Sequence, residues 1–157
     1  MRSFIDMQTK RSKIIYPTLS YKITGLMYKT HNYLGRYKNE KQYGDYFEQL
    51  LKREKIKYER EKSLPPSFEG EKNRRNIPDF IIENKIIIEF KASRLITKED
   101  YYQMRRYLSS YNKKLGILVN FRNTSLAPKR ILNVELLSKT NSYNYGVLPR
   151  FNNRKKL

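Results

Sequence analysis

Residues 77–92, which read IPDFIIENKIIIEFKA, decide the fold of this chain. Two apolar runs, Phe80–Ile82 and Ile86–Ile88, flank a polar turn that contains Asn84. Short β-branched runs separated by such a turn are typical of the two strands of a hairpin. The sequence therefore predicts an antiparallel pair of strands around which the rest of the chain is organised.

Three charged residues lie at one end of this predicted hairpin. Asp79 precedes the first strand, and Glu89 and Lys91 close the second. Folding the pair about Asn84 brings Asp79 and Glu89 to the same end. Side chains two positions apart on a strand share a face, so Glu89 and Lys91 point the same way. We therefore expect two acids and one lysine to converge at the edge of an apolar sheet.

This arrangement has a chemical interpretation. Two neighbouring carboxylates repel each other, and one tends to take up a proton unless a cation lies between them. Mg²⁺ suits such a site, because it is commonly held by one or two carboxylates, waters and substrate phosphate oxygens. A nearby lysine would then place a point charge beside a phosphate or an attacking water. The residues predict metal-assisted phosphodiester hydrolysis, and the competing interpretation is a half-exposed hairpin with ordinary cross-strand ion pairs.

The composition favours a polyanionic partner. The chain has 157 residues, enough for one domain with a real core, and Lys+Arg 34 against Asp+Glu 15 gives a formal charge of +19. Such a charge points to DNA, RNA or, less well, an anionic membrane. The 14 tyrosines could stack on bases, although core and rim packing explains most of them.

Other compartments and chemistries are less consistent with the sequence. The absence of cysteine excludes disulfides and thiolate zinc sites. No apolar run approaches the ~20 residues of a membrane span, and residues 1–6 lack the apolar core of a signal peptide. We therefore expect a cytoplasmic protein.

The hairpin motif resembles a known signature. Pro78-Asp79, nine intervening residues and then Glu89-Phe90-Lys91 are similar to the signature of the PD-(D/E)XK nucleases. Residues 31–43 and 115–121 resemble segments of the GxxExxY proteins, a branch of that superfamily, and the similarity covers about residues 19–132. It implies an α/β fold with a restriction-endonuclease-like core. In that core a mixed central sheet of about four strands is flanked by helices in the order α-α-β-β-β-α-β.

One position departs from the motif that names this branch. Tyr37 stands where that motif has its glycine, and Gly35 lies two residues earlier and could keep the turn. The acid and the aromatic residue of the motif correspond to Glu40 and Tyr43. The resemblance implies that Glu40 is an accessory acid near the metal. Helix-dipole complementarity in a first turn explains Glu40 as well, and Tyr43 is as consistent with the core as with the site.

The resemblance also implies roles for residues on two predicted helices. His31, the only histidine, is a candidate metal ligand, and a capping role at a helix C-terminus is the alternative. The segment QMRRY at 103–107 resembles the Gln-x-x-x-Tyr helix motif of RecB-like nucleases. Gln103 would orient a ligand water or hold Lys91, and Tyr107 would contact the nucleic-acid backbone. An ordinary amphipathic helix explains the apolar face of this segment but not Gln103.

Hydrophobic periodicity, caps and turn residues divide the remaining chain into elements and regions. The sequence predicts a basic extension over 1–19, a nuclease-like domain over 20–137 and a basic, flexible tail over 138–157. Within the domain, the first helix is capped by Thr18 or Ser20. The predicted elements are helices over 20–34, 39–55 and 97–111, an edge strand over 56–64, a strand over 115–121 parallel to the Glu89 strand, and a weak helix or helix–strand pair over 127–137.

Together these observations predict a nuclease that depends on Mg²⁺ or Mn²⁺ and acts on DNA in preference to RNA. The sequence leaves open whether it forms a homodimer. The candidate metal-binding residues are Asp79, Glu89, Phe90 through its main-chain carbonyl, Glu40 and His31. The catalytic set is Asp79, Glu89, Lys91 and Gln103. Basic residues beside the site predict a nucleic-acid-binding set of Arg74, Arg75, Arg105, Arg106 and Tyr107. Two alternatives stay open: a basic nucleic-acid-binding module with a vestigial nuclease site, and an RNA-associated basic protein.

Overall fold

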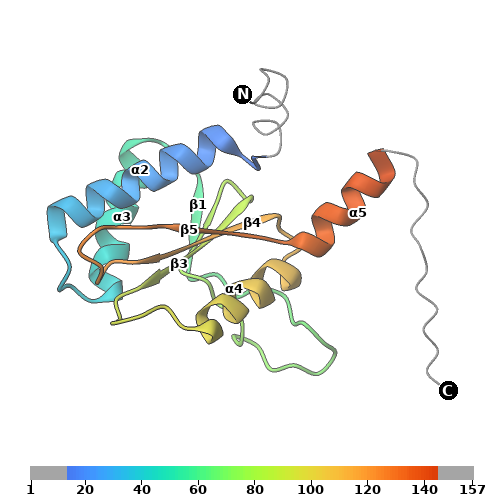
Figure 1. Cartoon of the computed structure of the whole chain (residues 1–157). Coiled ribbons are helices and arrows are strands. Elements are labelled where there is room, and N and C mark those ends of the chain that lie inside the picture. Colours follow the sequence, from blue (N-terminus) through green and yellow to red (C-terminus); the bar gives the residue numbers. More distant parts are fainter. Residues whose placement is uncertain (1–13, 145–157) are drawn as a thin grey trace.

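The structure, a computed structural model, describes residues 14–144 (Figure 1). Its centre is a five-stranded sheet in the order β1-β2-β3-β4-β5. This is the predicted α/β architecture, with five strands in place of about four. The elements in chain order are α2 (Pro17–Leu34), α3 (Glu40–Arg53), β1 (Tyr58–Arg60), β2 (Phe80–Ile82), β3 (Ile86–Lys91), α4 (Lys98–Ser110), β4 (Leu115–Asn120), β5 (Lys129–Leu132) and α5 (Val134–Asn144).

The predicted hairpin is confirmed. Strands β2 and β3 pair antiparallel, with Ile81 opposite Ile87. In the turn, Glu83 and Asn84 both have positive φ, 51° and 55°, which is the sign pattern of a type I′ turn. The main-chain N–H of Lys85 donates to the carbonyl oxygen of Ile82 at 2.8 Å and closes the turn. This turn fixes the register that brings Asp79 and Glu89 to one end of the strands.

The predicted β-α-β unit is also present. Strand β4 lies parallel to β3, with Glu89 opposite Leu118 and Lys91 opposite Asn120, and α4 is the connection between them. Thr97 caps α4: its side chain accepts from the main-chain N–H of Asp100, and the Asp100 carboxylate accepts from that of Thr97. The start of α4 is thus fixed beside the C-terminal end of β3, where Lys91 lies.

The sheet separates two apolar layers. Helices α2 and α3 cover one face and α4 lies on the other (Figure 1). Side chains alternate along a strand, so Phe80, Ile88 and Phe90 pack toward α2 and α3, whereas Ile81 and Ile87 pack toward α4. Glu89 lies between Ile88 and Phe90 in the sequence and therefore belongs to the α4 face, which is the face that carries the polar network described below.

Two elements near the N-terminus have other bounds than predicted. Helix α2 begins at Pro17 behind the N-cap Tyr16, because proline suits the first helical turn, and Ser20 lies inside the helix. Strand β1 spans only three residues, since Glu61 adopts a left-handed φ of 52°. It is nevertheless an edge strand, as predicted.

The C-terminal part also differs from expectation. Residues 127–137 form a strand followed by a helix, because β5 pairs antiparallel with β4 and Asn133 then accepts from the main-chain N–H of Leu136. Helix α5 continues to Asn144, past the predicted boundary between residues 137 and 138. Most of the predicted extension and tail, residues 1–13 and 145–157, lies outside the described residues. Within 14–144, no helix has the length and apolarity that crossing a membrane requires.

Candidate active site

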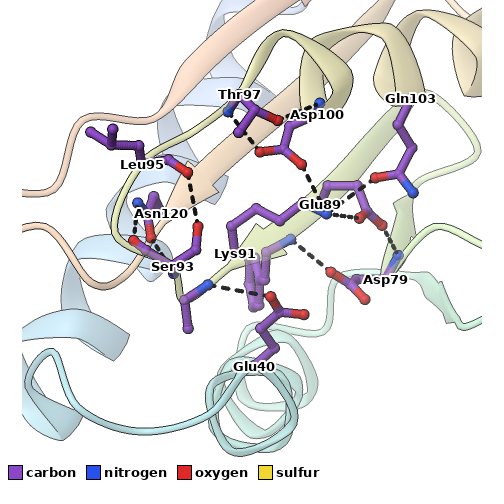
Figure 2. A network of polar contacts seen from close by, with 12 residues as sticks. Glu40, Asp79, Glu89, Lys91, Ser93, Leu95, Thr97, Asp100, Gln103 and Asn120 are labelled. Atoms are coloured by element: carbon purple, nitrogen blue, oxygen red, sulfur yellow. Dashed lines mark hydrogen bonds and ion pairs between the residues drawn. The ribbon is translucent and has the colours of Figure 1, made fainter.

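The two acids of the hairpin are joined across the strand ends. The main-chain N–H of Asp79 donates to Glu89 Oε1 at 2.8 Å, and the main-chain N–H of Phe90 donates to Asp79 Oδ2 at 2.7 Å. Figure 2 shows Asp79, which immediately precedes β2, close to Glu89 of β3. The structure thus brings these two carboxyl groups together, as the sequence predicted.

Burial makes the pair electrostatically costly. The Glu89 residue is 6% exposed. Desolvation, partly offset by the hydrogen bond from Phe90, and the charge of Glu40 together raise the pKa of Asp79 to about 6. Desolvation and then the charge of Asp79 raise the pKa of Glu89 to about 8. Without a compensating cation, the pair therefore holds a proton at a pH where isolated carboxylic acids would be ionised.

Lys91 lies beside the pair and is fixed by α4. Its Nζ lies 3.8 Å from Glu89 Oε2 and 3.5 Å from Asp100 Oδ1, and it donates to Gln103 Oε1 at 3.2 Å. Gln103 therefore holds Lys91, which is one of the two roles predicted for it. The start of α4 thus presents one amide and one carboxylate to the lysine, and these restrict a side chain that is otherwise flexible.

Glu40 reaches the site from the first turn of α3. Its Oε1 accepts from the main-chain N–H of Ala92 at 3.3 Å, just after Lys91 (Figure 2). Glu40, Asp79 and Phe90 also line a cavity of about 110 Å³ between α3 and the hairpin. Glu40 is therefore a neighbour of the pair. The Glu40 carboxylate has its own hydrogen-bond partner, the main chain of Ala92, and takes no part in the hydrogen bonds that join Asp79 and Glu89.

The chemistry of the donors fits a hard divalent cation. Within residues 14–144, no three histidine, cysteine or acidic side chains gather closely enough to hold a metal ion. A cation at the Asp79–Glu89 pair would therefore take its other ligands from main-chain, water and substrate oxygens. This sparse set of protein ligands is typical of Mg²⁺, which keeps several waters and uses one or two carboxylates. A cation would also neutralise the repulsion that burial amplifies.

The structure does not bring His31 to this pair. Its ring Nε2 is 2.9 Å from the carbonyl oxygen of Asn123, and the ring lies 6.2 Å from that of Phe121. His31 thus links the end of α2 to the loop after β4. This placement corresponds to the alternative role of His31 in capping and packing. Within the described residues, His31 makes no contact with Asp79 or Glu89 that would support its role as a metal ligand.

Of the four arginines predicted to contact nucleic acid, two lie in the β1–β2 connection and two lie on α4. Arg74 and Arg75 are exposed in the β1–β2 connection, a few residues before Asp79. Arg105 and Arg106 line a different hollow, of about 320 Å³, with Leu132 and Val134 near the start of α5.

Tyr107, the fifth residue of the predicted set, lies on α4. Its residue is 4% exposed, and its hydroxyl donates to the carbonyl oxygen of Ile77 at 3.3 Å. Burial, followed by the charges of Glu89 and Asp79, raises the pKa of this phenol. In this structure the Tyr107 hydroxyl supports the segment that leads into Asp79. The contact of Tyr107 with the nucleic-acid backbone stays a prediction.

Two polar groups of the site were not predicted from the sequence. Asp100 accepts from the main-chain N–H of Thr97 at the start of α4 and is also a partner of Lys91. Asn120 is 1% exposed and joins two loops: its Oδ1 accepts from the main-chain N–H groups of Ser93 and Arg122 at 3.2 Å each, and its Nδ2 donates to the carbonyl of Ser93 at 2.8 Å. A polar residue closing an apolar strand was the signal for Asn120.

An α/β sheet with two coupled acids and a lysine on adjoining strands defines a nuclease-type architecture. The family model of the PD-(D/E)XK nuclease superfamily matches residues 17–131, and the chain belongs to this superfamily. The crystal structure of SSO0001 is similar at a TM-score of 0.44 and 22% sequence identity, over 83% of this chain and 77% of that chain. A comparison with curated proteins found no match.

Proposed function

We propose that this protein is a divalent-metal-dependent nuclease that hydrolyses phosphodiester bonds in DNA in preference to RNA. Membership of the superfamily supports a nuclease-type function acting on nucleic acid. The observation that carries the finer proposal is the buried Asp79–Glu89 pair, coupled across two strands with Lys91 beside it. A formal charge of +19 supports a polyanionic substrate.

Asp79 and Glu89 would hold Mg²⁺ or Mn²⁺, with the main-chain carbonyl of Phe90 as a further ligand. The bound metal would polarise the phosphate and lower the pKa of an attacking water. Glu40, close to the pair but hydrogen-bonded to Ala92, would position a water rather than bind the metal directly.

Lys91 would stabilise negative charge that develops on the phosphate and help to position the water. Gln103 is a positioning residue, since it acts through Nζ of Lys91. Asp100, on the same helix as Gln103, places its Oδ1 3.5 Å from the same ammonium group. A preorganised lysine contributes more to catalysis than a freely moving one, because it needs no reorientation when charge develops.

The GxxExxY branch is a finer proposal within the superfamily. Glu40 and Tyr43, which match its acid and aromatic positions, have separate jobs here: Glu40 faces the site, while the Tyr43 hydroxyl donates to the carbonyl of Gly35 at 2.6 Å. Gly35 has a φ of 74°, which favours glycine. It thus supplies the turn even though Tyr37 occupies the position of the motif's glycine. A homodimer that cuts both strands of a duplex is compatible with this proposal.

The proposal is tested by cleavage of plasmid and labelled oligonucleotides with Mg²⁺ or Mn²⁺. Wild-type protein is compared with Asp79→Ala and Lys91→Ala, and with Glu69→Gln as a control for an exposed acid in the β1–β2 connection. We expect metal-dependent cleavage by the wild type and the control, and its loss in both site variants.

Equal traces of cleavage in all four proteins would identify a contaminating nuclease and contradict the proposal. Salt-dependent nucleic-acid binding without metal-dependent cleavage would instead favour a binding module with a vestigial site. Binding of RNA in strong preference to DNA, again without cleavage, would favour the RNA-associated alternative.

A further inference from the structure

Two arginines from distant parts of the chain are interlocked beside the site. Nε of Arg36 donates to the carbonyl oxygen of Arg122 at 2.9 Å, and Nε of Arg122 donates to the carbonyl of Arg36 at the same distance. Nη2 of Arg122 also reaches the carbonyl of Ala92 at 3.4 Å. These bonds use Nε of each arginine and Nη2 of Arg122. The remaining η nitrogens keep donors available for another ligand, as the five donors of each group allow.

The loops that carry the two arginines are themselves fixed. The buried Tyr43 hydroxyl accepts from the main-chain N–H of Lys38 at 3.3 Å while it donates to Gly35, so it holds the loop around Arg36. Asn120 holds the main chain of Arg122. Neither residue needs an arginine side chain for its own hydrogen bonds, so the fold presents both guanidinium groups on a rigid frame.

Tyr37 completes the arrangement. Its residue is 77% exposed, and the guanidinium carbons of Arg36 and Arg122 lie 5.2 Å and 5.8 Å from the centre of its ring. These are cation–π distances. An exposed aromatic ring that contacts two guanidinium groups restricts their rotamers and leaves their charge in place. A carboxylate in the same position would restrict the rotamers but would also neutralise the charge.

The arginine pair is continuous with the carboxylate pair. Glu40 lines the cavity that contains Asp79, and it also lines a hollow of about 500 Å³ with Tyr37, Ala92 and Arg122. A third hollow, of about 640 Å³, shares Arg122 and is completed by Arg36, Arg94, Asn123 and Thr124. Shared residues thus connect the acids to the arginines along one side of the molecule.

The cations along this path lack acidic partners. Within residues 14–144, none of them forms an ion pair with a carboxylate, in contrast to Arg60, which pairs with Asp45 and Glu48. Uncompensated and partly desolvated arginines need an anion, and their planar donors match the oxygens of a phosphate. The cations that line the two outer hollows are Arg36, Lys38, Lys41, Arg94 and Arg122.

We propose that Arg36, Arg122 and Arg94 bind backbone phosphate of the nucleic-acid strand whose scissile bond lies at Asp79 and Glu89. This inference rests on the proposed function for the identity of its ligand. It deepens that function by giving the strand a path over the protein surface. The strand leaves the carboxylate pair past Glu40 and Ala92 and crosses the arginine pair. Because the contacts are to phosphate, they are independent of base sequence.

The test measures binding of a fluorescein-labelled single DNA strand by fluorescence anisotropy in EDTA, over a series of salt concentrations. The variants are Arg36→Gln, Arg122→Gln and Arg94→Gln. Arg53→Gln, at the exposed end of α3, is the matched control for loss of one positive charge. We expect each of the three to weaken binding severalfold and to reduce the slope of log K against log salt by about one, while the control changes neither.

Equal binding by the three variants and by Arg53→Gln would overturn the inference. If the arginine pair proves necessary for folding, as judged by circular dichroism, Arg94→Gln decides alone, because Arg94 is exposed and makes no hydrogen bond within the described residues. An excess of inorganic phosphate that competes as well as unlabelled strand would also overturn it, since that outcome assigns the arginines to a free anion.

The outcome is separable from that of the nuclease proposal, because binding in EDTA requires neither metal nor cleavage. Weakened binding in a protein that never cleaves would uphold the arginine path and contradict the nuclease. Normal binding by all three variants of an active enzyme would do the reverse.

Discussion

Asp79 and Glu89 each depend on the other's strand: the main-chain N–H of Asp79 donates to the Glu89 carboxylate, and the Asp79 carboxylate accepts from the residue after Glu89. The same two side chains therefore align the strand ends and present a buried pair of acids. A structural role and a chemical role coincide, so alanine substitutions confound the two. Substitutions that keep the acceptor oxygen and remove the charge separate them.

Glu89→Gln should stabilise the metal-free protein at pH 8. Burial raises the pKa of Glu89, so ionising it costs folding free energy, and the amide retains an oxygen that can accept from Asp79. We expect the free energy of unfolding in EDTA, measured by urea denaturation, to increase by at least about 1 kcal/mol. Cleavage assayed separately with Mg²⁺ should be lost. A variant less stable than wild type at this pH would contradict the electrostatic account.

The stability of wild-type protein should fall as the pH rises in EDTA. The pKa values of Asp79 and Glu89 are raised in the folded state, to about 6 and about 8, so the native protein binds more protons than the unfolded chain above about pH 4. Stability then decreases with pH through this window, up to about pH 8. Saturating Mg²⁺ should reverse the loss at pH 8, because it binds the folded state preferentially.

Thermal unfolding from pH 5 to pH 8, with and without Mg²⁺, checks this expectation. The double variant Asp79→Asn, Glu89→Gln is the control, and the contribution of this pair to the pH dependence should be absent from it. Stability that rises with pH in the wild type, relative to the double variant, would refute the assigned direction.

Gln103→Ala should lower activity without unfolding the protein. The amide only holds Nζ of Lys91, so its loss should reduce kcat by about 10- to 100-fold, as is typical for groups that orient a site residue, and leave KM little changed. Lys91→Ala should lose more. Gln49→Ala, an exposed glutamine on α3, is the matched control. Steady-state kinetics in which Gln103→Ala equals this control would show that Lys91 needs no partner on α4.

Gly116→Ala should destabilise the fold. A Cβ at this position would clash with the side chain of the buried Met104, so this side chain or α4 itself would have to shift. Overpacking of this kind costs about 1–3 kcal/mol. Gly25→Ala is the matched control, because nothing lies within 4 Å of its Cβ and alanine is favoured inside a helix. Urea denaturation in which both variants behave alike would show that the α4–β4 contact is looser than described.

Local rules predicted the part of the site that lies within the hairpin. Alternation along β3 puts Glu89 and Lys91 on one face, and the turn at Asn84 fixes where Asp79 meets them. These are consequences of sequence spacing alone. The family resemblance supplied Gln103, whose contact with Lys91 depends on how α4 packs against the sheet.

The remainder depended on tertiary contacts. Tyr107 is buried because α4 turns this side toward the sheet, and a helical pattern does not say how deeply one ring sits. Strand β5 carries Lys129 and Arg130 among its four residues and forms an edge through pairing with β4, so its own sequence gave little signal. Arg36 and Arg122 are 86 residues apart and meet through main-chain carbonyls, which have no sequence signature.

Calorimetric titration with Mn²⁺ at pH 8 tests the central claim, that Asp79 and Glu89 together bind a divalent cation. The account predicts saturable binding by wild-type protein and by the exposed-acid control Glu69→Gln, and loss of that binding in Asp79→Asn and in Glu89→Gln. Undiminished Mn²⁺ binding by either site variant, with folding intact, would contradict it.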